Sequence, residues 1–132
     1  MCVRSIVAFA VLAIAIEAGL QTITVTGTTV CHRRRVAGVL VALMERDTDW
    51  FDTDDLLQEV RSDANGDFTL TGSESELGTI TPYIRISHEC DAKPNCKRIA
   101  EYDAPTDKIG STYEMTYISM NIAVKDEKEE CP

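Results

Sequence analysis

A two-residue alternation of apolar and polar side chains recurs along this chain and constrains its fold more than any other feature. The segment TITVT at 22–26 alternates threonine with isoleucine and valine, and YIRIS at 83–87 alternates isoleucine with polar residues. This period is that of a half-buried β-strand, and β-branched residues favour strands. Further strands are expected at 36–44, 97–102 and 113–124. We therefore predict an all-β protein, an antiparallel two-sheet β-sandwich of seven to eight strands with one short helix.

Local signals predict where the chain turns. Asn65-Gly66 lies between two strand-like segments and predicts a two-residue β-hairpin, because these residues readily adopt the positive φ angles of such a turn. The segment SESELG at 73–78 predicts the short helix, with Ser73 as its N-cap. A change of alternation phase near Ile118 predicts a bulge or turn there.

The first residues predict export. Arg4 precedes an apolar run that is too short to cross a bilayer but suits the roughly 7–15 apolar residues of a secretory signal. We assign 1–19 to a signal peptide and 20–132 to one β-sandwich domain with an acidic C-terminal tail. No later segment predicts a transmembrane helix, so we expect a secreted, extracellular protein.

Charge narrows the range of partners. The net charge is −9, which argues against nucleic acid and against anionic membranes in general, since both favour basic proteins. Arg33, Arg34 and Arg35, next to His32, are a local exception. Three adjacent arginines at a turn could hold a phosphate or sulfate head group, and the alternative is a solvated turn paired with carboxylates.

Four cysteines follow the predicted signal. An even number in a small exported domain is typical of disulfides. Of the three possible pairings we favour the short loop Cys90–Cys96 together with Cys31–Cys131, which would tie the C-terminal tail to the first strand.

His88 is in phase with Ile84 and Ile86, so it should face inward. A buried histidine that hydrogen-bonds within the protein is one interpretation, and a zinc ligand is the other. Zinc would need free thiolates, and His32 beside Cys31 could complete such a site only in a reduced protein. We therefore predict no metal site, and the spacing of Cys90 and Cys96 is not that of a redox pair.

The acidic segment 47–55 contains two adjacent aromatics, Trp50 and Phe51. We interpret it as a solvated loop whose carboxylates could weakly collect calcium, and we treat Trp50 and Phe51 as candidate ligand contacts, since aromatics are enriched at interfaces. No pairing of a nucleophile with a general base is apparent. We predict no catalytic residue, no cofactor and no enzymatic activity.

These segments together resemble the nematode transthyretin-like family of secreted proteins. The resemblance rests on ITVTGTTVC, DTDDLL, DANGDFTLTG, PYIRISHEC with the downstream CKR, and the late MNIAV before a terminal cysteine. It covers essentially the whole mature chain and implies a transthyretin-type sandwich. The related hydroxyisourate hydrolases end in Tyr-Arg-Gly-Ser, whereas this chain ends DEKEECP, so the resemblance does not imply hydrolase activity.

The function expected from these features is that of a secreted binding or adaptor protein. It would recognise an extracellular protein, or an anionic lipid or glycan head group, through loops at one end of the sandwich. The alternative is a carrier of small hydrophobic ligands that acts as an oligomer, and the sequence is compatible with a homo-oligomer.

Overall fold

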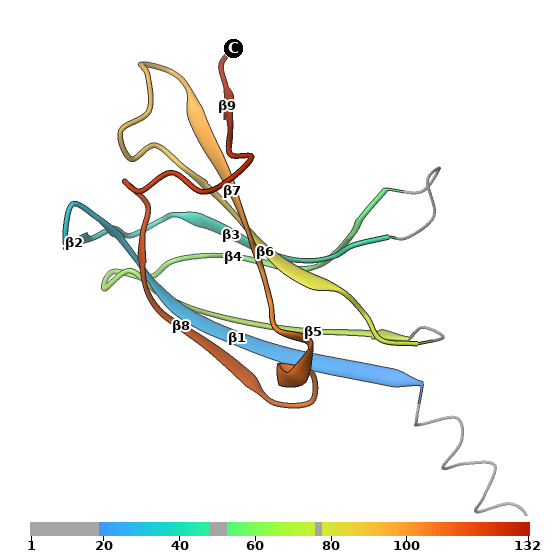
Figure 1. Cartoon of the computed structure of the whole chain (residues 1–132). Helices are drawn as coiled ribbons and strands as arrows, with labels where there is room; N and C mark the ends of the chain where they lie inside the picture. Colours follow the sequence, from blue (N-terminus) through green and yellow to red (C-terminus); the bar gives the residue numbers. More distant parts are fainter. Residues whose placement is uncertain (1–18, 48–52, 76–77) are drawn as a thin grey trace, which may run out of the picture.

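The computed structural model describes residues 19–47, 53–75 and 78–132, and it shows a β-sandwich (Figure 1). The predicted all-β class is confirmed, although the described part contains nine strands, of which β2 and β9 are very short. Its single helical element is a 3₁₀ turn, η1. The elements in chain order are β1 Leu20–Cys31, β2 Arg34–Arg35, β3 Leu40–Glu45, β4 Asp55–Arg61, β5 Asp67–Ser75, β6 Pro82–His88, β7 Lys97–Asp103, η1 Thr106–Lys108, β8 Thr112–Ser119 and β9 Lys128–Glu130.

Two sheets face each other across the core. In the first sheet β1 pairs with β5, β2 and β8, and in the second the order is β4-β3-β6-β7-β9. All pairs are antiparallel except β1 with β8, which is parallel. The predicted antiparallel sandwich therefore contains one parallel pair of strands. The chain passes through η1 from β7 in one sheet to β8 in the other, and a crossing of this kind allows parallel neighbours.

The predicted alternation produces the core. Ile23 and Val25 of β1 and Ile84 and Ile86 of β6 lie in the core between the sheets and are fully buried. His88 continues the inward row of β6, as its phase predicts, and is buried. The main core cluster consists of Ile23, Val25, Val39, Val41, Leu43, Phe68, Leu70, Ile84, Ile86, Cys90, Ala104, Ile118 and Met120.

The turn at Asn65-Gly66 forms, but it does not make the predicted hairpin. The backbone N–H groups of Asn65 and Asp67 both donate to one carboxylate oxygen of Asp63, at 2.9 Å. The strands on either side then separate, because β4 pairs with β3 whereas β5 pairs with β1 in the other sheet. The turn therefore connects the two layers. Local turn chemistry cannot distinguish such an arch from a hairpin, since both need the same tight reversal.

Two other local predictions are corrected in position. Residues 73–75 of the expected helix are the last residues of β5, and residues 76–77 lie outside the described ranges. The predicted irregularity in the last long strand is present, but it falls at Thr116, whose φ is 59° and where the register against β1 shifts. The predicted signal peptide also lies outside the described residues, apart from position 19.

The sheets approach closely at Gly72 of β5. A Cβ atom there would lie 2.6 Å from Cβ of Leu57 and 2.9 Å from a methyl carbon of Leu43, both in the opposite sheet. We expect Gly72→Ala to lower the free energy of unfolding by about 1–3 kcal/mol, because the extra methyl group overpacks the core. Urea denaturation measures the change, and Thr69→Ala on the exposed face of β5 should stay within about 0.5 kcal/mol of the parent protein. A Gly72→Ala protein as stable as its parent would contradict this packing.

Candidate functional site

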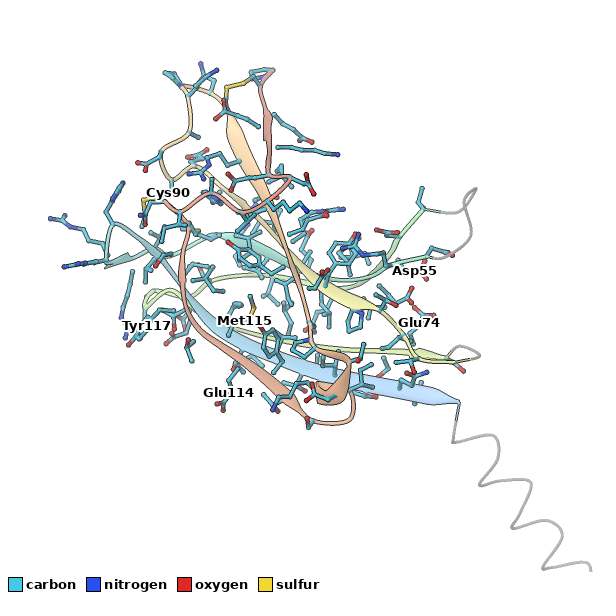
Figure 2. All side chains as sticks on the ribbon, viewed as in Figure 1. Asp55, Glu74, Cys90, Glu114, Met115 and Tyr117 are labelled. Atoms are coloured by element: carbon cyan, nitrogen blue, oxygen red, sulfur yellow. A yellow bond between two sulfur atoms is a disulfide. The ribbon has the colours of Figure 1, made fainter. Side chains whose placement is uncertain are left out.

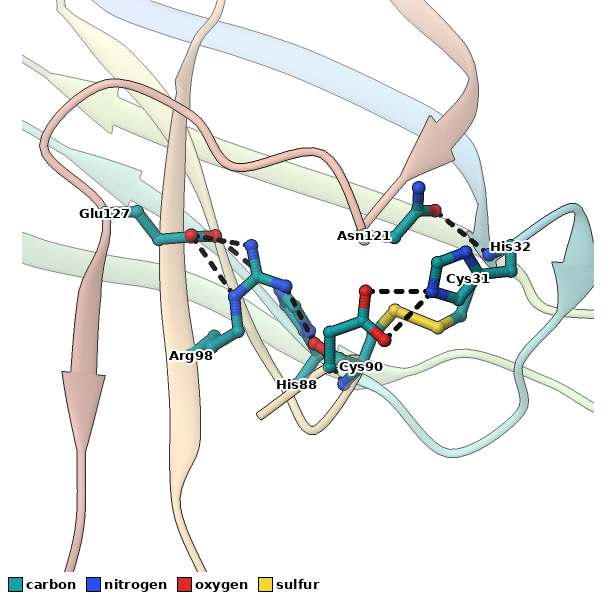
Figure 3. Close-up of a disulfide and its surroundings, with 8 residues drawn as sticks. Cys31, His32, His88, Cys90, Arg98, Asn121 and Glu127 are labelled. Atoms are coloured by element: carbon teal, nitrogen blue, oxygen red, sulfur yellow. Dashed lines mark hydrogen bonds and ion pairs between the residues drawn. A yellow bond between two sulfur atoms is a disulfide. The ribbon is translucent and has the colours of Figure 1, made fainter. Parts of the chain in front are cut away.

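A disulfide joins the two sheets at one end of the sandwich. Cys31 is the last residue of β1 in the first sheet, and Cys90 follows β6 in the second. Their Cα atoms are 5.9 Å apart, and the bond lies against the core (Figure 3). The loops that leave β1 and β6 are therefore held next to each other.

A second disulfide, Cys96–Cys131, acts within one sheet. Cys96 directly precedes β7, and Cys131 directly follows β9, which pairs with β7. The bond fixes the acidic C-terminal tail to the sheet, so the tail ends in an ordered strand rather than in free chain.

All four cysteines are paired, as predicted, but the favoured connectivity Cys90–Cys96 and Cys31–Cys131 is wrong. Cys90 faces the core between the sheets, where Cys31 packs against it. Cys96 instead belongs to a turn, with its N–H donating to the carbonyl of Lys93. Closeness in sequence favoured the short loop, whereas burial and the unpredicted strand β9 decide the pairing.

The basic turn begins immediately after Cys31. His32 and Arg33 have φ angles of 48° and 69°, so the chain reverses tightly and Arg34 and Arg35 return as β2 beside β1. Positive φ at both central residues is the requirement of the tight hairpin turns that match strand twist. The backbone N–H of His32 donates to the side chain of Asn121, and Nε2 of its ring lies 2.8 and 2.9 Å from the two carboxylate oxygens of Asp91.

The three arginines of this turn are exposed but differ in their contacts. Arg35 donates to the carbonyl of Asn65 and to the hydroxyl of Tyr117, its guanidinium lies 5.5 Å from the centre of the Tyr117 ring, and Asp67 is 3.6 Å away. Among the residues that the structure describes, Arg33 and Arg34 form no ion pair. Two cationic groups are therefore directed at solvent, and the third is held in place by an aromatic ring.

Apolar side chains adjoin the arginines. Tyr117 and Ile122 are each 64% exposed, and they line the same groove. Figure 2 shows Tyr117 and Cys90 at the same end of the sandwich, opposite the end that carries Asp55 and Glu74. Tyr117 was not among the predicted site residues, although its place in the alternation with Tyr113 and Met115 was visible. A shallow groove of about 320 Å³ is lined by Tyr102, Tyr113, Met115, Tyr117, Ile118, Ser119, Ile122 and Val124.

A buried polar cluster supports this end from within. Arg98 donates through Nε and Nη2 to Glu127, at 3.2 and 2.7 Å, and through Nη1 to the carbonyl of Cys90. His88, only 3% exposed, accepts the N–H of Cys90 on Nδ1, and its Nε2 lies 3.8 Å from a carboxylate oxygen of Glu127. Burial lowers the pKa of His88, the charge of Arg98 lowers it further, and Glu127 acts in the opposite direction. His88 is thus neutral at physiological pH and structural in its contacts, which agrees with the first of the two interpretations from sequence.

Acid should therefore destabilise the protein through His88. Its pKa in the folded state lies below the value of about 6.5 in the unfolded chain, so the unfolded state binds the proton more readily. Above a pH of about 6.5, His88 does not change the free energy of unfolding with pH. The free energy of unfolding decreases as the pH falls from about 6.5 toward the lower pKa of His88 in the folded state. We expect His88→Gln to flatten this part of the curve of unfolding free energy against pH. Equal slopes between pH 7 and 5 in the two proteins would contradict the assignment.

The predicted contacts Trp50 and Phe51 lie outside the described residues, so they remain a prediction. Of the acidic segment around them, Asp54 is engaged. It accepts hydrogen bonds from the hydroxyl of Tyr83, which is fully buried, and from the backbone of Asp47. The hydrogen bond from Tyr83 is the main cause that lowers the pKa of Asp54. Arg46 lies over the Tyr83 ring at 4.2 Å, so this network packs the outer face of the second sheet at the other end.

The fold and the basic turn define a class of protein. It is a β-sandwich with two disulfides that presents a basic turn beside exposed aromatic and aliphatic side chains. The transthyretin-like family model, TTR-52, matches residues 26–105. Transthyretin-like protein 16 of Caenorhabditis elegans is 50% identical over 115 residues, which cover 86% of each chain. Transthyretin-like proteins 33 and 2 of the same organism are 34% and 33% identical, over 98% and 74% of this chain and 94% and 70% of theirs. The chain belongs to the transthyretin-like family, as its motifs indicate.

Proposed function

We propose that this protein is a secreted binding protein that recognises anionic head groups through the basic turn at 33–35. The observation that carries the proposal is that the guanidinium groups of Arg33 and Arg34 are exposed and form no ion pair with any residue that the structure describes. Guanidinium groups bind phosphate and sulfate through two parallel hydrogen bonds. Arg35 and Tyr117 hold the turn beside an apolar surface, which suits a ligand with an anionic group next to hydrocarbon.

The acidity of the whole molecule does not prevent such binding. The net charge is −9, but at physiological ionic strength the Debye length is about 8 Å, so carboxylates at the far end of the sandwich are screened. Of the nearby carboxylates, Asp67 lies beside the guanidinium group of Arg35, and Asp91 contacts the ring of His32. Arg33 and Arg34 add two positive charges at the turn that no ion pair among the described residues offsets.

An anionic lipid surface fits the turn better than an isolated anion. Each arginine near an anionic bilayer contributes about 1 kcal/mol, and tyrosine favours the interface between water and hydrocarbon. Tyr117 and Ile122 would add apolar contact next to the charges. Binding of this kind is weak for one copy and rises with the density of anionic lipid.

The disulfides support export, and the contacts of the two histidines support a role in binding. Two disulfides suit an oxidising compartment. In the described part of the chain no helix is long and apolar enough to cross a membrane. The histidines are engaged, His32 with Asp91 and His88 with Cys90, so a binding role accounts for this end better than acid–base chemistry does.

A double variant that removes the charges of Arg33 and Arg34 tests the proposal. We expect Arg33→Ala/Arg34→Ala to weaken binding to vesicles of phosphatidylserine in phosphatidylcholine by roughly 30-fold, corresponding to about 2 kcal/mol, and to reduce its salt dependence. Vesicle sedimentation measures it. Lys108→Ala/Lys128→Ala removes the same charge elsewhere and should have little effect.

Equal binding by the parent and the arginine variant would contradict the proposal. Binding of the parent to sulfated glycan but not to vesicles, with the same loss in the arginine variant, would keep the anion-binding role and replace lipid by glycan as its source.

The groove beside β8 supports the second candidate function, a carrier of small hydrophobic ligands. Its volume of about 320 Å³ is at the lower end of the range for small-molecule sites. Its exposed wall at Tyr117 and Ile122 would need a second copy to enclose a ligand, so we place this function after head-group binding.

A further inference from the structure

Four side chains with zinc-binding atoms converge at the disulfide that joins the sheets. The sulfur atoms of Cys31 and Cys90, one ring nitrogen of His32 and one carboxylate oxygen of Asp91 all lie within 4.8 Å of one another. They come as two adjacent pairs, one at the end of β1 and one just after β6 (Figure 3). The ring of His32 already contacts Asp91.

Backbone conformation explains how neighbouring residues reach one point. Consecutive side chains in a strand point to opposite faces, so a Cys-His or Cys-Asp pair would normally diverge. Here the second residue of each pair leaves the extended conformation, with φ of 48° at His32 and 54° at Asp91. Non-glycine residues adopt this conformation at a cost. Both turns bring the polar side chain back beside the preceding cysteine.

We propose that reduction of Cys31–Cys90 converts this cluster into a tetrahedral Zn²⁺ site. Two molecules of a small thiol reduce the disulfide, forming their own disulfide and leaving two cysteine thiols. Zn²⁺ then binds both sulfurs as thiolates and releases their two protons to water. The neutral ring of His32 and the carboxylate of Asp91 complete the coordination.

The ligand set and spacing suit zinc. Zinc bonds of about 2.0–2.3 Å place the ligands of a tetrahedral site roughly 3.3–3.8 Å apart. The four atoms already lie within 4.8 Å, so separation of the two sulfurs and small side-chain rotations are the movements required. Thiolate with imidazole selects zinc over calcium and magnesium, which prefer oxygen ligands.

The surroundings hold the ligands in place and admit a reductant. The N–H of Cys90 donates to His88 and its carbonyl accepts from Arg98, so its backbone is fixed on both sides. The backbone of His32 is fixed by Asn121. A cavity of about 310 Å³ is lined by both Cys31 and Cys90, which gives a small thiol a path to the bond.

The other disulfide provides an internal comparison. Cys96 and Cys131 have one further candidate ligand among the described residues, Glu129, and no histidine. A fully reduced protein should therefore bind one Zn²⁺ tightly, at Cys31 and Cys90.

The experiment reduces the full mature chain with a phosphine, which does not itself bind zinc strongly, and titrates it with Co²⁺ and then Zn²⁺. We expect one equivalent of Co²⁺ to give tetrahedral visible bands with thiolate charge transfer, and Zn²⁺ to displace it. Alkylation and mass spectrometry should show Cys31 and Cys90 protected by Zn²⁺, and Cys96 and Cys131 modified. The oxidised protein should give no such spectrum.

Variants test the remaining ligands. His32→Ala and Asp91→Asn should each weaken Zn²⁺ binding at least tenfold, since even residues outside the coordination shell cost about 10–100-fold. Glu89→Gln, an exposed neighbour of Cys90, should leave the affinity unchanged.

Several results would overturn the proposal. They are an octahedral Co²⁺ spectrum, protection of Cys96 and Cys131 instead, or affinities unchanged by His32→Ala and Asp91→Asn. If reduction unfolds the metal-free chain, Zn²⁺ should restore its far-ultraviolet circular dichroism, and failure to do so would also overturn it. Head-group binding is measured on the oxidised protein, so either proposal can fail without the other.

Discussion

The covalent link between the sheets at Cys31–Cys90 is the constraint on which the rest of this molecule depends. It joins the end of β1, the strand that pairs with β2, β5 and β8, to the end of β6 at the centre of the opposite sheet. In the chain-entropy model a loop of 59 residues corresponds to about 4 kcal/mol of stabilisation, a large part of the stability of a domain of this size. The bond also fixes the position of the basic turn, which starts at the next residue.

A buried ion pair adds to the constraint that the disulfide imposes on this end of the sandwich. Arg98 and Glu127 form a nearly dry ion pair, and breaking such a pair costs more than an exposed pair can contribute. With Cys96–Cys131, the pair holds the C-terminal segment against β7. Cross-links and contacts that are formed before binding lower the conformational entropy that recognition would otherwise cost.

Much of the fold follows from patterns within short segments, and the rest depends on contacts between distant ones. Alternation identifies β1 and β6 and the inward direction of His88, because a strand has only two faces. It cannot tell that Asn65-Gly66 joins two sheets, nor that β8 runs parallel to β1, since both depend on which strands meet. The same limit applies to the cysteines: their oxidation is predicted from their even number and from the expected export, but their pairing depends on β9, a three-residue strand with no alternation of its own. At the site, the sequence predicts the basic turn at Arg33–Arg35 from its charge alone. The exposure of Tyr117 and the contact between His32 and Asp91 depend on the three-dimensional structure, so the sequence does not show them.

Peptide mapping of the native, unreduced protein tests the central claim most directly. Proteolysis at slightly acidic pH, which suppresses disulfide exchange, followed by mass spectrometry identifies the linked peptides. The account predicts a peptide pair that joins Cys31 to Cys90 and another that joins Cys96 to Cys131. A peptide that links Cys90 to Cys96, or Cys31 to Cys131, would show that Cys31 is not bonded to Cys90 and would contradict the account.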